Sequence, residues 1–195
     1  MSSNSVLSKA VPFVLSITRI VIGFLVLWHG LIKVFGFPAG QGDAVPVMSL
    51  IGLTGVIELV GGALIMLGLF TRPAAAVLFI EMGISYLVLY LPQGFASITN
   101  DGEAALLYCF FSLFVAAAGA GAWGLDRFFN RKGEGKTASP FASVHADKAL
   151  AVMRIMVAAM FIQHGMQKYL GWFGSRPDHN WGTIRAWGGV MEFYL

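Results

Sequence analysis

The sequence predicts an all-α membrane protein: a four-transmembrane-helix bundle, followed by one complete and one incomplete helix of a second copy. Three observations support this fold class. Of the 195 residues, 57% are hydrophobic and only 12% are charged, whereas soluble domains carry about 25% charged residues. The mean hydropathy is +0.73. Several apolar segments approach the length of a bilayer span, and one pattern of ionisable residues occurs twice within them.

Four segments of the first unit have the length of a transmembrane helix, which requires about 20 mostly apolar residues. They are 11–34, 49–70, 73–91 and 103–124. Glycine and proline end the first segment at Phe35-Gly36-Phe37-Pro38, and Pro73 begins the third. Asn100-Asp101-Gly102-Glu103 has the composition of a helix cap before the fourth segment.

The remainder of the chain resembles the beginning of a second unit. We expect the first unit at 11–130, a cytoplasmic linker at 131–146 and a partial second unit at 147–195. The second unit contains a fifth helix at 147–169 and the start of a sixth at 187–195, which has about half the length of a span. We interpret this as a truncated reading frame. A fragment of a tandem protein, or a helix completed by another subunit, are the alternatives.

The repeated pattern places ionisable residues inside apolar helix. Arginine is followed after ten residues by His-Gly and then by lysine, in Arg19, His29-Gly30 and Lys33 and again in Arg154, His164-Gly165 and Lys168. A glutamate follows each copy, in Gly55-Val56-Ile57-Glu58 and in Gly189-Val190-Met191-Glu192. Ionisable side chains in a bilayer are costly, so their repetition predicts a polar cluster with a function.

The basic residues predict the orientation of the chain. They fall in the N-terminal segment, the second loop and the linker, which alternate spans place on one side: Lys9, Arg72, Arg127, Arg131, Lys132 and Lys136. The positive-inside rule makes this side cytoplasmic. No basic run is interleaved with aromatic residues, so we expect no nucleic-acid partner despite a pI near 9.2.

The candidate catalytic residues are His29, Glu58 and Glu81, and the candidate ligand-binding residues are Arg19, His29, Lys33 and Glu103. His29 and Lys33 share a helix face. Arg19 lies about 15 Å lower along the helix, so we expect it to pair with Glu58 or Glu81 rather than with His29. A histidine beside a carboxylate can pass protons or donate a hydrogen bond to the carbonyl of a quinone-like ligand.

Structural roles are the alternative for each of these residues. Arg19 and its acid would then fix the helix register, and His29 would satisfy a backbone carbonyl. Lys33 would be an interfacial anchor and Glu103 a helix-start residue. Asp126 is expected to be solvated.

Metal and haem sites have weaker support. One histidine per unit does not supply two haem ligands, and the spacing of His29, Glu58 and Glu81 does not support a metal site, so we expect no metal. The single cysteine, Cys109, excludes an internal disulfide or dithiol site, so redox chemistry requires an outside cofactor or partner.

The first unit resembles the DoxX family of bacterial four-helix membrane proteins over about residues 11 to 130. The resemblance rests on motifs in a fixed order, beginning with Arg19-Ile20-Val21-Ile22-Gly23, His29-Gly30-Leu31-Ile32-Lys33 and Gly55-Val56-Ile57-Glu58-Leu59-Val60-Gly61-Gly62. It continues with Leu67-Gly68-Leu69-Phe70-Thr71-Arg72, Asn100-Asp101-Gly102-Glu103-Ala104-Ala105-Leu106-Leu107 and Gly119-Ala120-Gly121-Ala122-Trp123-Gly124-Leu125-Asp126. Residues 147–195 are similar to the opening of a second such unit.

The resemblance implies a multi-pass protein of the bacterial cytoplasmic membrane and a subunit of a redox complex. The family takes its name from a subunit of a thiosulfate:quinone oxidoreductase, and some relatives are described as partners in oxidative-stress complexes. We therefore expect a quinone ligand, with a soluble redox subunit and a second copy of the chain as candidate partners. A non-catalytic membrane scaffold, or a small-molecule or proton-coupled carrier using Glu58 and Glu81, are the alternative functions.

Overall fold

The computed structural model describes residues 4–39, 42–126 and 140–174, and within these ranges the chain is helical, with no strand. The long helices are α1 (Asn4–Phe35), α2 (Leu50–Leu67), α3 (Thr71–Ser85), α4 (Glu103–Ala118) and α6 (Pro140–Leu170). A π-helical turn, η1 (Tyr86–Tyr90), and a 3-10 turn, η2 (Leu91–Gln93), extend α3, and η3 (Trp172–Gly174) follows α6. The predicted all-α class is confirmed.

Four helical stretches are long and apolar enough to cross a membrane: Ala10–Phe35, Leu50–Leu67, Thr71–Gln93 and His145–Leu170. These four candidate spans coincide with the segments predicted at 11–34, 49–70, 73–91 and 147–169. The predicted sixth helix at 187–195, including Glu192, lies outside the described residues. The division into two units therefore stays a prediction.

The predicted fourth span, 103–124, is too long at its C-terminal end. Helix α4 has 16 residues and ends at Ala118, which makes it about 24 Å long. The backbone leaves the helix because Gly119 (φ 88°) and Gly121 (φ 74°) take left-handed conformations. Residues 119–126 then run as an irregular segment beside the ends of α1 and α2, where Ala122 N donates to Pro12 O at 3.0 Å.

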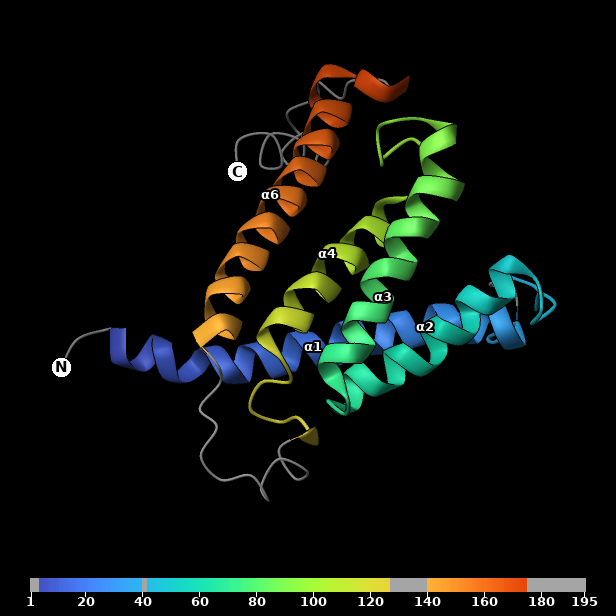
Figure 1. The fold of residues 1–195 in the computed structure, drawn as a ribbon. Coiled ribbons are helices and arrows are strands. Elements are labelled where there is room, and N and C mark those ends of the chain that lie inside the picture. Colours follow the sequence, from blue (N-terminus) through green and yellow to red (C-terminus); the bar gives the residue numbers. More distant parts are fainter. Residues whose placement is uncertain (1–3, 40–41, 127–139, 175–195) are drawn as a thin grey trace.

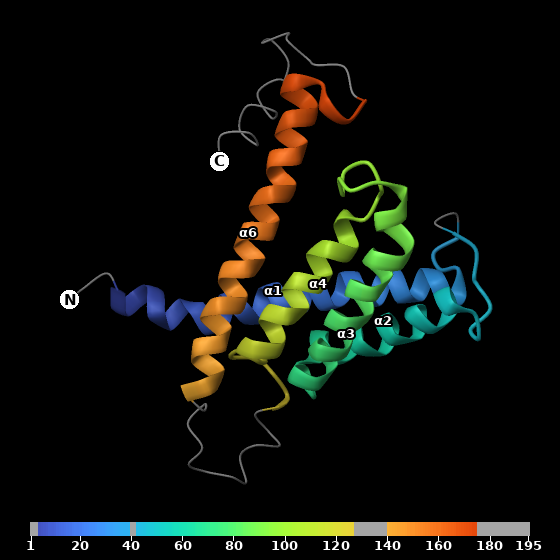
Figure 2. The same cartoon turned by 45° about the horizontal axis from the view of Figure 1, so that its top comes forward.

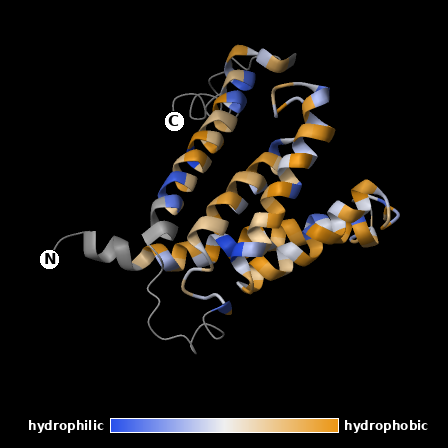
Figure 3. Cartoon of the chain, in the orientation of Figure 1, coloured by the Kyte–Doolittle hydropathy of each residue, from blue (hydrophilic) through white to orange (hydrophobic). Residues whose placement is uncertain are grey.

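The helices form two groups that cross each other. Helices α1 and α2 lie side by side, and α3, α4 and α6 form a second group in which α4 lies between the other two (Figures 1 and 2). Hydrophobic residues cover most of the helix surfaces, whereas hydrophilic residues of α6 gather toward its two ends (Figure 3). The helices predicted to form one bundle are therefore arranged as two groups that cross each other.

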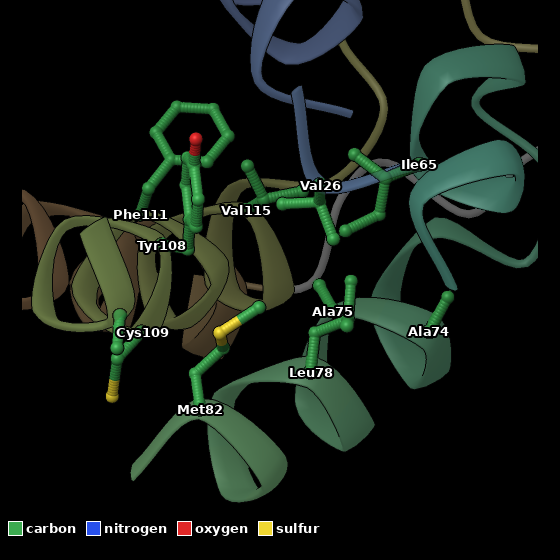
Figure 4. Packing of buried hydrophobic residues seen from close by; sticks show 11 residues of the cluster. Val26, Ile65, Ala74, Ala75, Leu78, Met82, Tyr108, Cys109, Phe111 and Val115 are labelled. Atoms are coloured by element: carbon green, nitrogen blue, oxygen red, sulfur yellow. The ribbon is translucent and has the colours of Figure 1, made fainter. Parts of the chain in front are cut away.

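A small apolar core joins the two groups. Val26 of α1 and Ile65 of α2 meet Leu78 of α3 and Val115 of α4, and none of the four is more than 1% exposed (Figure 4). Glycines bring α1 and α2 close together, because a Cβ at Gly62 would lie 2.5 Å from Leu27 N of α1. Such close approach is typical of helix packing in membranes.

Candidate functional site

Arg19 of α1 lies beside the C-terminal end of α2. Its side chain is fully buried. Nε donates to Ala120 O at 2.9 Å, and Nη2 donates to Trp123 O at 3.4 Å. Nη1 donates to Met66 O at 2.7 Å and also donates to Ile65 O. The expected ion pair with Glu58 or Glu81 is therefore wrong. Instead, Arg19 donates to carbonyls in the last turn of α2, of which Ile65 O also accepts from Gly68 N at 3.0 Å, and it holds the segment after α4.

Asp126 stabilises the beginning of α3. Its Oδ1 accepts from Phe70 N at 2.7 Å and its Oδ2 accepts from Thr71 N at 3.0 Å. The first N–H groups of a helix lack intrahelical acceptors and carry a partial positive charge, so a carboxylate is favourable there. The expectation that Asp126 is merely solvated is wrong. The cap comes from a residue 55 positions away from Thr71, which local sequence does not indicate.

Lys33 and Glu58 form an ion pair between α1 and α2. Lys33 Nζ lies 2.5 Å from Glu58 Oε1, and it also donates to Thr54 Oγ1 at 3.4 Å. The Glu58 side chain is only 3% exposed, while that of Lys33 is 28% exposed. Lys33 is thus more than an interfacial anchor, because it supplies the positive charge that compensates a carboxylate buried within a span.

Glu81 presents a second buried carboxylate, on α3. Its side chain is 7% exposed, and its Oε1 accepts from Ser85 Oγ at 2.9 Å. Within the described residues, Glu81 Oε2 and Glu58 Oε2 are buried and accept no hydrogen bond. The two carboxylates are near enough for Glu58 to act electrostatically on Glu81. Two buried acceptor atoms therefore lack a donor in one region of the bundle.

His29 lies on α1, one helical turn before Lys33. The ring is partly buried, and its centroid is 5.5 Å from that of Tyr108 of α4 in an edge-on arrangement. The charge of Lys33 also acts on His29, and the charge of Glu58 acts on Tyr108. The structure thus brings His29, Lys33, Glu58 and Glu81 together with Tyr108, and we call these five residues the polar cluster. Tyr108 was missed from the sequence, where a hydroxyl in the apolar segment 103–124 was the available signal.

A groove of about 550 Å³ runs between α2 and α3 beside the polar cluster. Its walls are aliphatic, and its polar side chains are those of Thr54, Glu81 and Ser85. The aliphatic residues are Leu50, Ile51, Leu53, Ile57, Val77, Ile80, Ile84, Val88 and Leu89. Glu81 is therefore the ionisable group of a groove that otherwise suits an apolar molecule.

Glu103 lies apart from the polar cluster, at the beginning of α4. His164 Nε2 of α6 lies 2.9 Å from Glu103 Oε1 and 3.1 Å from Oε2. Next to it, Gln163 Oε1 accepts from Ser97 Oγ at 3.2 Å. Glu103 thus helps to attach α6 to α4, and the structure does not bring it to His29. The two repeated histidines have different surroundings, since His29 faces Tyr108 and His164 faces a carboxylate.

Across the described ranges, no three His, Cys, Asp or Glu side chains gather as a metal site. Cys109 is buried, with Sγ 3.5 Å from Phe79 O. The side chains of the polar cluster offer charge, hydrogen bonding and proton exchange.

Comparisons with known proteins identify the family of the chain. Residues 14–91 match the DoxX family model. An uncharacterized protein of Haemophilus influenzae is 41% identical over 133 residues, which cover 65% of this chain and 98% of the relative. No solved structure matches the chain. The chain belongs to the DoxX family of integral membrane proteins.

Proposed function

We propose that the protein is a membrane subunit of a redox complex, in which the polar cluster binds a quinone-like ligand or exchanges protons with it. One observation carries this proposal. Two buried carboxylates on neighbouring helices each keep an acceptor atom without a donor, and one of them opens on an apolar groove. Such groups are costly within a bilayer, and they are typical of proton and ligand pathways.

The groove has the chemistry that a quinone requires. Its aliphatic walls suit an isoprenoid tail that enters from the bilayer, and Glu81 and Ser85 offer hydrogen-bonding groups for a ring oxygen. When bound, a quinone would supply the two-electron carrier that the side chains lack. A protonated Glu81 donates a hydrogen bond from Oε2, while an ionised Glu81 accepts one.

The remaining residues of the cluster provide a route for protons toward Glu81. Lys33 holds the charge of Glu58, and Glu58 acts electrostatically on Glu81. His29 lies one helical turn before Lys33 toward the end of α1, and an imidazole can accept a proton on one nitrogen and donate one from the other. We propose that His29 connects the cluster to the outer aqueous side, with the N-terminus in the cytoplasm. A soluble partner would bring the electron donor.

The test measures the quinone that remains with the protein after purification into lipid nanodiscs. Wild type is compared with Glu81→Gln, Glu58→Gln and His29→Ala, and Glu103→Gln is the matched control because it changes a carboxylate outside the cluster. We expect quinone in the wild type and the control, and a loss of at least about tenfold in Glu81→Gln, since about 1.4 kcal/mol of hydrogen bonding corresponds to that factor. Wild type without quinone, or equal quinone in all variants, would contradict the proposal.

A scaffold function is the second candidate, and the surroundings of Arg19 favour it. This arginine is the most deeply buried ionisable group of the repeat, and its hydrogen bonds within the described residues all go to backbone carbonyls, as expected of a structural role. If the cluster residues act in the same way, their variants lower the melting temperature and leave ligand content unchanged. A proton-coupled carrier would instead show transport that Glu58→Gln and Glu81→Gln abolish.

A further inference from the structure

A cavity of about 610 Å³ lies where α1 and α3 begin and α4 ends (Figure 1). The candidate spans of α1 and α3 start at Ala10 and Thr71, so the cavity is at the level of the membrane surface. Arg72 lines it and lies against the backbone that leaves α4, because a Cβ at Gly119 would be 3.4 Å from Arg72 Nε. We call this space the surface cavity. No residue of the polar cluster lines it.

The surface cavity carries a positive charge that its walls do not balance. Arg72 is exposed, and its guanidinium makes no hydrogen bond or ion pair within the described part of the chain. Asp126, on the same walls, accepts from Phe70 N and Thr71 N, and its charge acts on the buried Arg19. The Thr71 Oγ1 is buried and has no partner among the described residues. Hydrocarbon satisfies neither Arg72 nor Thr71, whereas a hydrated phosphate group can satisfy both.

An apolar groove of about 460 Å³ adjoins the surface cavity, with Phe70 and Pro73 on the walls of both. The groove follows α2 and α3 past Val60 and ends at Val77, which also lines the groove that contains Glu81. Val77 lies seven residues beyond Phe70, which is about 10 Å deeper in the membrane. A charged cavity at the membrane surface that continues into an apolar groove matches an amphipathic ligand.

We infer that the surface cavity binds the phosphate of an anionic phospholipid, with Arg72 paired with the phosphate and one acyl chain in the adjoining groove. Basic pockets between transmembrane helices bind such headgroups, and a guanidinium can donate two parallel hydrogen bonds to a phosphate. The groove favours a lipid over a soluble phosphate, because only a lipid brings a chain to cover its apolar walls. This site goes beyond the proposed function, since it uses neither the polar cluster nor the groove that contains Glu81.

The test titrates delipidated protein in detergent with dioleoyl phosphatidylglycerol, and native mass spectrometry counts the bound lipid. We expect one tightly bound lipid per wild-type chain. Arg72→Gln should lower the affinity about tenfold because charge-assisted hydrogen bonds are lost, and Arg72→Lys should lower it less because the charge remains. Arg154→Gln is the matched control, since it removes an exposed arginine of α6 and should leave the affinity unchanged.

A second pair of variants tests the groove. Val60 lines the groove and is 53% exposed, whereas Val21 of α1 is 50% exposed and lines neither the groove nor the surface cavity. Val60→Trp should fill the groove and lower the affinity for phosphatidylglycerol several-fold, and Val21→Trp should not. Glycerol phosphate, which has no acyl chain, should bind more weakly than phosphatidylglycerol and should not distinguish the two variants.

Equal phosphatidylglycerol affinity of wild type and Arg72→Gln would overturn the inference, and so would an affinity that Val60→Trp leaves unchanged. Glycerol phosphate that binds wild type as tightly as phosphatidylglycerol would assign the surface cavity to a soluble phosphate instead. Phosphatidylcholine that binds equally tightly would overturn the choice of an anionic lipid. The quinone content of Arg72→Gln should equal that of wild type, so the failure of this inference and the failure of the proposed function are distinguishable.

Discussion

Arg19 and Arg154 occupy the same place in the repeat, and replacing each by leucine should have opposite effects. Arg19 is fully buried and binds carbonyl oxygens at the end of α2 and in the segment after α4. Arg154 is exposed on α6. Arg19→Leu removes a buried hydrogen-bond network, whereas Arg154→Leu only removes an arginine from a span. Comparing the two variants therefore separates these two effects.

The expected magnitude follows from the hydrogen bonds of Arg19. Three of its four bonds, those to Ala120, Ile65 and Met66, are short, and hydrogen bonds within membrane proteins contribute about 0.6–1.7 kcal/mol each. Replacing Arg19 by leucine also removes the free-energy cost of burying a guanidinium, which partly offsets the loss of these hydrogen bonds. We expect Arg19→Leu to lower the free energy of unfolding by about 2–4 kcal/mol. Arg154→Leu should leave it unchanged or raise it, since a charge leaves the lipid.

The assay is reversible unfolding in mixed detergent micelles, at a dilution at which the protein is monomeric, followed by the circular dichroism of the helices. Arg19→Lys should lie between wild type and Arg19→Leu, because lysine keeps the charge but not the planar set of donors. Equal destabilisation by Arg19→Leu and Arg154→Leu would refute this reasoning. So would an Arg19→Leu variant as stable as wild type.

Three further predictions concern packing, capping and the ion pair, with the same unfolding assay. Gly62→Ala should lower the free energy of unfolding by more than about 1 kcal/mol because its Cβ meets the backbone of α1. Gly83→Ala, whose Cβ would lie 3.6 Å from Cys109 Sγ, should be neutral or stabilising. The opposite order would contradict the glycine contact. Asp126→Ala should lower the free energy of unfolding by about 1–2 kcal/mol, because the first N–H groups of α3 lose their acceptor. An unchanged free energy of unfolding would show that this cap is not needed. Lys33→Met should lower the free energy of unfolding by about 2–4 kcal/mol, because Glu58 then has no partner, and adding Glu58→Met should recover most of this loss. Equal stability of the single and the double variant would argue against the ion pair.

The spans of α1, α2, α3 and α6 could be predicted because apolar length and glycine or proline breaks are local properties of the sequence. The end of α4 was missed because residues 119–124 remain mostly apolar although the backbone turns at Gly119. Apolar character alone does not distinguish a helix from irregular backbone that packs against protein.

The partners within the site were harder to predict than the site residues themselves. Glu58 interacts electrostatically with Glu81, which is not part of the repeated pattern, and His29 lies against Tyr108. The acceptors of Arg19 are backbone carbonyls, which side-chain patterns do not reveal. The pairing of Lys33 with Glu58 depends on which faces of α1 and α2 meet, and the close approach at Gly62 settles this in three dimensions.

The central claim is that the buried carboxylates respond to a quinone, and infrared difference spectroscopy tests it most directly. Quinone-free protein in nanodiscs is titrated with a short-chain quinone, and the carboxyl C=O stretching region is recorded. We predict a difference band in wild type that disappears in Glu81→Gln and persists in Glu103→Gln. A spectrum with no carboxyl band in wild type, or the same band in Glu81→Gln, would contradict a quinone-linked role for the polar cluster.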